Sequence, residues 1–155
     1  MNRIRKKIIK RLAAITLIEV LVSIGVIGMT LTMVAGFIKY QQPAMELSGS
    51  SNELRSALNE ARGLTLTTQS VHGVHFIMEA NQYEIIEQGS GAPTVLKTVM
   101  LPGAISYATV GPFTNDTILF NTAGAATESG AISIENTYGN SASVIVNPSG
   151  FISIQ

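Results

Sequence analysis

A long apolar run occupies the N-terminal part of the chain. Over residues 12–38, Glu19 is the only charged residue. Residues 20–38 give 19 uncharged positions in a row, and a helix rising ~1.5 Å per residue carries them nearly across the ~30 Å hydrocarbon core of a bilayer. The pattern therefore predicts a transmembrane helix over residues 15–39.

A second, amphipathic pattern follows residue 40. Apolar residues recur at intervals of seven, four and three, which places them on one face of a helix: Leu47, Leu54, Leu58 and Ala61. We expect this helix to extend to residue 69. Its apolar stripe should pack on the domain's own sheet rather than bind a partner.

Two features predict interruptions of this helix. Pro43 lacks the N–H that would bond to the carbonyl of Lys39, so a kink or break is expected there. The sequence Gly49-Ser50-Ser51-Asn52 should weaken the helix further, because Ser51 or Asn52 can cap a second helical piece.

From residue 71 the pattern changes to short β-prone runs separated by turn residues. The predicted strands cover residues 71–78, 82–87, 94–101, 105–110, 117–121, 131–135, 143–147 and 151–154. Regular spacing of this kind is typical of a small antiparallel sandwich. The sequence thus predicts an α+β fold, with an N-terminal helix over residues 15–69 and a β-rich globular domain over residues 70–155.

The formal net charge of zero conceals an uneven distribution. Six of the ten basic residues lie within residues 1–11, and no acid lies among them. By the positive-inside rule, this places the N-terminus in the cytoplasm and the β-rich domain outside the inner membrane. After residue 14, four basic residues face ten acids, a formal charge of minus six, which disfavours binding of nucleic acid.

Two ordinary alternatives fit the hydropathy, a secretory signal peptide and a plain signal anchor. A secretory apolar region covers ~7–15 residues and ends at small residues. Here the apolar run is longer. The best small-residue cleavage site after it, at Ala44, has Pro43 at position −2. Neither alternative accounts for Glu19. A carboxylate at that depth costs about 2.5–3.5 kcal/mol on insertion scales, which indicates that it has a partner.

The segment Ala14-Ile15-Thr16-Leu17-Ile18-Glu19 resembles the class III prepilin signal, in which a basic leader precedes Phe-Thr-Leu-Ile-Glu and a long apolar helix. The resemblance implies that residues 1–14 are a leader, that prepilin peptidase cuts between Ala14 and Ile15, and that Ile15 becomes the N-methylated first residue. It also assigns Thr16 and Glu19 to filament assembly, with the Glu19 carboxylate neutralised by the N-terminal amine of an adjoining subunit. The chain departs from the family pattern twice: Ala14 stands where Gly is usual, and Ile15 where Phe is usual.

Four further blocks narrow the resemblance to the GspH/FimT group of minor pilins and type II secretion pseudopilins: residues 54–62, 99–103, 118–124 and 144–150. This implies a structural subunit, not an enzyme, that helps to initiate or cap a type II secretion pseudopilus or a type IV pilus. The implied partners are prepilin peptidase, other pilin or pseudopilin subunits and the inner-membrane assembly platform. The implied location is the inner membrane and, after assembly, the fibre.

Some members of the group bind DNA for natural transformation through a Gly-Arg-x-Arg motif near the C-terminus. The corresponding residues here are Gly150-Phe151-Ile152-Ser153, which lack both arginines. We therefore expect no DNA binding by this route. A DNA-binding minor pilin and a plain membrane-anchored β domain stand as the alternative functions.

The sequence predicts no catalytic, cofactor or metal site. The absence of cysteine excludes thiol catalysis and cysteine metal sites, and the HExxH, GxSxG and phosphate-binding glycine motifs are missing. His72 and His75 lie three apart in a predicted strand, which sends them to opposite faces. Asn115-Asp116 supplies one acid without neighbouring carboxylates, so we interpret it as a turn rather than a calcium loop.

Overall fold

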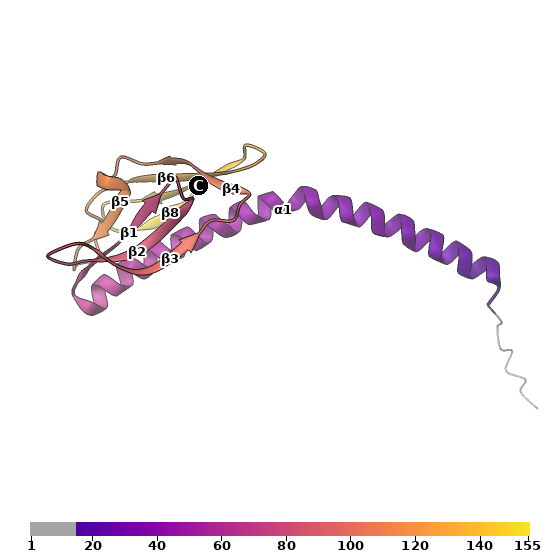
Figure 1. The fold of residues 1–155 in the computed structure, drawn as a ribbon, viewed down its shortest axis with the longest axis horizontal. Helices are drawn as coiled ribbons and strands as arrows, with labels where there is room; N and C mark the ends of the chain where they lie inside the picture. Colours follow the sequence, from indigo (N-terminus) through magenta and orange to yellow (C-terminus); the bar gives the residue numbers. More distant parts are fainter. Residues whose placement is uncertain (1–14) are drawn as a thin grey trace, which may run out of the picture. The chain divides into compact units, whose positions relative to one another are not determined.

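The structure, a computed structural model, describes residues 15–155, except for the side chains of residues 34–40. The predicted leader over residues 1–14, with Ala14 at its end, lies outside the described residues. The chain divides into two units, Met1–Lys39 and Tyr40–Gln155. A single long helix, α1 (Leu17–Thr68), contributes to both of them (Figure 1).

The N-terminal part of α1 is apolar and exposed. Its large side chains include Leu17 at 79% exposure, Ile18 at 68% and Met33 at 80%. The sequence predicts a transmembrane segment over residues 15–39. In the described part of the chain, no helix combines the length and the apolar character that crossing a bilayer requires.

Of the kink or break predicted at Pro43, the break is wrong, because α1 continues through this residue. A proline removes one helical hydrogen bond, but tertiary contacts hold this turn in place. The Pro43 carbonyl accepts a hydrogen bond from Nδ2 of Asn136 at 3.3 Å, and Leu47, one turn later, is buried in the core.

The second predicted helix start, at Ser51 or Asn52, is also wrong. The Ser51 hydroxyl and the Asn52 amide both donate to the carbonyl of Ser48, at 3.0 and 2.8 Å. These side chains therefore bond back into the helix instead of capping a new one. The helix ends as predicted near residue 69, where Gln69 adopts a φ of 58° and its N–H bonds to the Thr65 carbonyl at 3.1 Å.

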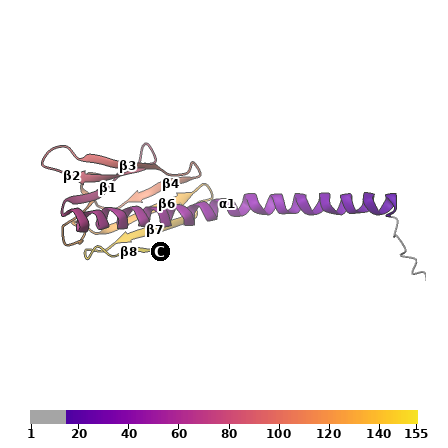
Figure 2. The ribbon, with the colours of Figure 1, turned by 90° about the horizontal axis from the view of Figure 1, so that it is seen from below.

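Within residues 15–155, eight strands form two antiparallel sheets (Figures 1 and 2). The first sheet has the order β3-β2-β1-β5, with β1 Val71–Ile77, β2 Gln82–Gln88, β3 Thr94–Met100 and β5 Thr117–Phe120. The second has the order β4-β6-β7-β8, with β4 Ile105–Val110, β6 Gly130–Asn136, β7 Ser141–Val146 and β8 Ile152–Ile154. One short helical turn, η1 (Thr114–Asp116), precedes β5. The eight predicted strands and the α+β fold class are confirmed.

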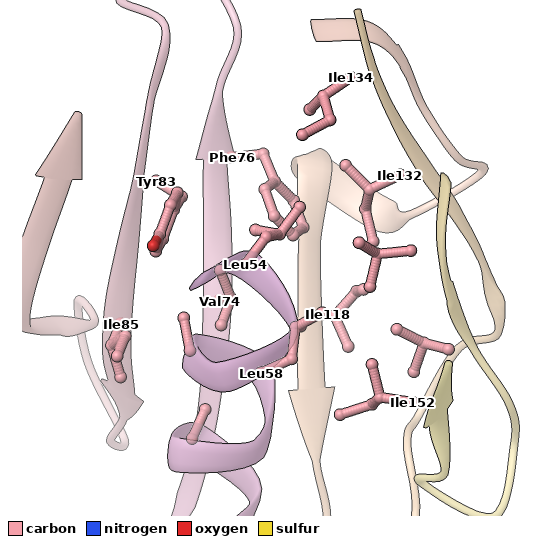
Figure 3. Packing of buried hydrophobic residues seen from close by; sticks show 14 of the residues in the cluster. Leu54, Leu58, Val74, Phe76, Tyr83, Ile85, Ile118, Ile132, Ile134 and Ile152 are labelled. Carbon is pink, nitrogen blue, oxygen red and sulfur yellow. The ribbon is translucent and has the colours of Figure 1, made fainter. Parts of the chain in front are cut away.

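Both sheets and the C-terminal half of α1 share one hydrophobic core. Figure 3 shows Leu54 and Leu58 of α1 between Val74 of the first sheet and Ile132 of the second, and all four side chains are fully buried. Alternate strand residues point into this core, as in the pattern of β5, where Ile118 is buried and its neighbours are less so. The predicted packing of the helical stripe on the domain's own sheets is confirmed.

The ring of Tyr83 lies in this core, and its hydroxyl has no hydrogen-bond partner among the described residues. Burial, reinforced by the carboxylates of Glu53 and Glu60, raises the pKa of Tyr83, so the phenol stays neutral.

An unpaired buried hydroxyl destabilises the fold by about 1–3 kcal/mol. Tyr83→Phe should therefore leave the free energy of unfolding unchanged or raise it by up to about 1–2 kcal/mol, measured by urea unfolding of the full chain followed by circular dichroism.

Tyr107→Phe provides the matched control. The Tyr107 hydroxyl donates to the carbonyl of Gln82 at 3.3 Å, so its removal should lower the free energy of unfolding by about 1 kcal/mol. A Tyr83→Phe variant that is destabilised as much as Tyr107→Phe would show that the Tyr83 hydroxyl has a partner.

Candidate functional site

The first turn of α1 is formed by the residues that the sequence singles out for assembly. The Thr16 hydroxyl accepts the backbone N–H of Glu19 at 3.3 Å, and the Thr16 carbonyl accepts the same N–H at 3.1 Å. Thr16 is thus the N-cap of the helix, a contact that contributes about 1 kcal/mol in typical proteins. The resemblance gives Thr16 no such role, although the Thr-x-x-Glu spacing is itself the sequence signature of a capped helix start.

Glu19 lies in the first turn of α1 and is exposed. Its negative charge is favourable there, because unpaired N–H groups make a helix N-terminus electropositive. The side chain lines a hollow of about 250 Å³ together with Ile15, Val20, Ser23 and Ile24. Among the described side chains, which leave out those of residues 34–40, one ion pair is present, between Lys97 and Glu60 at 3.4 Å. Glu19 therefore has no counter-charge within the described chain.

The surroundings of Glu19 are apolar and also exposed. Ile15 is 72% exposed and Leu21 is 61% exposed. An apolar surface of this extent on a helix marks a contact with other molecules. The structure thus brings Ile15, Thr16 and Glu19 together at one helix end, whereas Ala14 lies outside the described residues.

The two histidines do not form a joint site. His72 is buried on the core side of β1, and its Nδ1 lies 2.9 Å from the Ser70 carbonyl. His75 points to the opposite face, where its Nδ1 lies 2.9 Å from the hydroxyl of Thr117. The prediction of opposite faces is confirmed.

Asn115 and Asp116 form a turn, as predicted, with φ values of 53° and 50°.

The segment that would carry the DNA-binding motif begins in a crowded turn beside α1. Arg62 donates from Nε to the carbonyl of Gly124 at 2.8 Å. Gly150 has a φ of 77°, and a Cβ added to it would overlap the same Gly124 oxygen. The loop that contains Gly124 and the loop that contains Gly150 thus both pack against Arg62 of α1.

The family model described as type II transport protein GspH matches residues 50–150. The chain belongs to the GspH family. The match covers the last part of α1, from residue 50, together with strands β1 to β7, and it confirms the group to which the sequence blocks point. A comparison with curated proteins finds no match.

Solved structures agree with the family assignment at the level of the fold. The minor pseudopilin EpsH from the type II secretion system of Vibrio cholerae has a TM-score of 0.61 at 11% identity, covering 71% of this GspH-family chain and 96% of EpsH. The type IV minor pilin FimU of Pseudomonas aeruginosa has a TM-score of 0.60 at 13% identity, covering 77% of this chain and 92% of FimU. At these identities the likeness shows the pilin-like fold alone.

Proposed function

We propose that this chain is a minor pilin or pseudopilin, a structural subunit that helps to initiate or cap a type II secretion pseudopilus or a type IV pilus. The observation that supports this most strongly is the first turn of α1, where Glu19, which has no counter-charge among the described side chains, is surrounded by exposed apolar side chains. Such a helix needs lipid or other subunits to cover it. The family is one of structural subunits, and we propose no catalytic role for the chain.

We further propose that prepilin peptidase cuts the chain between Ala14 and Ile15 and that Ile15 is then N-methylated. The cut removes six positive charges that would hold the helix end at the cytoplasmic headgroups. It also creates an amine that can neutralise the Glu19 carboxylate of a neighbouring subunit. Processing would thus convert an anchored precursor into a subunit that can leave the lipid.

Before assembly, the precursor would reside in the inner membrane with its N-terminus in the cytoplasm and the domain outside. The support for this is the run of 19 uncharged residues at 20–38 and the basic segment that precedes it. Its partners would be prepilin peptidase, other pilin or pseudopilin subunits and the assembly platform.

Mass spectrometry of the protein made with its cognate prepilin peptidase tests this proposal. We expect a mature chain that begins at Ile15 and carries one extra methyl group on its N-terminal amine. The same protein from cells without the peptidase should retain Met1, apart from ordinary methionine removal. Retention of the leader in the presence of the peptidase, or a cut well downstream near Ala44, would contradict the proposal.

A further inference from the structure

The outer face of the first sheet, which points away from the core, carries two rows of side chains. Strand register places Thr98, Glu84, His75 and Thr117 side by side in a polar row. The adjacent row contains Val95, Ile86, Gly73 and Leu119 and is apolar. This face therefore joins an apolar strip to a polar strip across all four strands.

Gly73 lets β1 and β5 approach each other closely on this face. It has no side chain in the middle of the apolar row, and a Cβ at this position would overlap the carbonyl oxygen of Ile118 in β5. A depression on this face, which we call the outer hollow, has a volume of about 330 Å³. Its floor includes Ile86, which is only 4% exposed although it faces away from the core. Val95 and Leu119 continue the apolar floor on either side.

Two carboxylates line the outer hollow, and the three basic residues of the unit Tyr40–Gln155 do not. Glu128 is fixed in place, because it accepts the backbone N–H of Thr114 at 2.7 Å and the Thr114 hydroxyl at 2.6 Å. These bonds lower the pKa of Glu128, so it stays charged. Glu84 accepts the Thr98 hydroxyl at 3.3 Å. Glu128 thus keeps its negative charge at the hollow, and no lysine or arginine of the unit Tyr40–Gln155 lines it.

The spacing of the carboxylates indicates what kind of cation fits. Glu84 lies on β2 and Glu128 lies beyond β5, and β1 separates these two strands. The strands are therefore roughly 10 Å apart. No three His, Asp, Glu or Cys side chains among residues 15–155 gather closely enough to hold a metal ion. A partner with two separate basic groups matches this arrangement better than one small ion does.

We propose that the outer hollow binds an extended segment of a partner protein that presents a basic, an apolar and a second basic side chain on one face. In an extended chain, every second residue faces the same way, so positions i and i+4 lie about 13 Å apart. The apolar side chain rests on Ile86, Val95 and Leu119, while the basic groups pair with Glu84 and Glu128. Charge complementarity supports this occupant, because Tyr40–Gln155 has three basic residues against nine acids, a formal charge of minus six.

The test uses the full chain in detergent micelles and the acetylated, amidated pentapeptide Arg-Ser-Leu-Ser-Arg. Two-dimensional NMR should show saturable shifts of the backbone amides of Gly73, His75 and Leu119. The peptide Glu-Ser-Leu-Ser-Glu should cause none of these shifts. Replacing the peptide's leucine by serine should weaken binding several-fold, because the apolar contact is lost.

The double variant Glu84→Gln/Glu128→Gln should weaken binding at least about tenfold. Its matched control is Glu79→Gln/Glu135→Gln, which removes the same charge from positions that do not line the hollow. Glu84→Gln alone leaves the contacts of Thr114 intact and should still weaken binding. Equal weakening by both double variants, shifts confined to other surfaces, or no binding would overturn the proposal. None of these results depends on filament assembly.

Discussion

Changing Glu19 to alanine should leave the proposed cut between Ala14 and Ile15 unaffected and strongly reduce the amount of the subunit recovered in filaments. In a bundle of packed helices the alanine leaves the neighbouring amine without a counter-charge. Breaking a buried pair by removing one partner costs about 3–5 kcal/mol. We therefore expect at least a tenfold fall in the ratio of sheared filament protein to total processed protein, measured by quantitative immunoblotting.

Glu46→Ala is the matched control for this experiment. Glu46 is an acid of the same helix, but it belongs to the unit Tyr40–Gln155 and bonds to the side chain of Gln42 at 2.8 Å. Its replacement should leave incorporation near the wild-type level. If Glu19→Ala assembles as well as Glu46→Ala, the proposed pairing of Glu19 with an amine is wrong.

Gly150→Ala should destabilise the domain severely. The residue has a φ of 77°, and the added Cβ would overlap the Gly124 carbonyl that Arg62 holds by a hydrogen bond. The cost combines a left-handed backbone, at roughly 1–2 kcal/mol, with a clash against backbone atoms that cannot rotate away. We expect a loss of more than about 3 kcal/mol in the free energy of unfolding, measured by urea unfolding of the full chain followed by circular dichroism.

Gly139→Ala separates the cost of the left-handed backbone from the cost of the clash. Gly139 has a φ of 79°, but a Cβ there would meet nothing within 4 Å. Its replacement should cost only the backbone term, about 1 kcal/mol. Similar losses for the two variants would mean that the contact between Gly150 and Gly124 relaxes easily and that Arg62 does not fix these loops.

The sequence predicts the elements of this fold well, because each has a local signal. The eight strands follow from short β-prone runs, and the helical face follows from Leu47, Leu54 and Leu58. The predictions fail where tertiary contacts outweigh local preference. Pro43 does not end the helix because Asn136, 93 residues later, bonds to its carbonyl, and no local pattern contains that contact.

Of the two candidate sites, the sequence predicts the one at the start of α1 and does not predict the outer hollow. Ile15, Thr16 and Glu19 are adjacent in sequence, so a motif is enough to find them. The outer hollow depends on strand register, which brings Gly73, Ile86 and Leu119 into one row. Sequence alone does not give that register. The role of Gly124 and Gly150 cannot be predicted from the sequence either. Their contact forms only when both loops pack against Arg62 in the folded domain.

The hydrogen bonds that join α1 to residues far along the chain also bear on how fast the domain folds. Arg62 bonds to a residue 62 positions away, and Pro43 to one 93 positions away. Chains dominated by such non-local contacts have high contact order and fold in times on the order of milliseconds to seconds. Because 62 and 93 residues separate the partners of these two bonds, α1 is synthesised long before the residues that hold it in place, and it stays without them until most of the chain has been made.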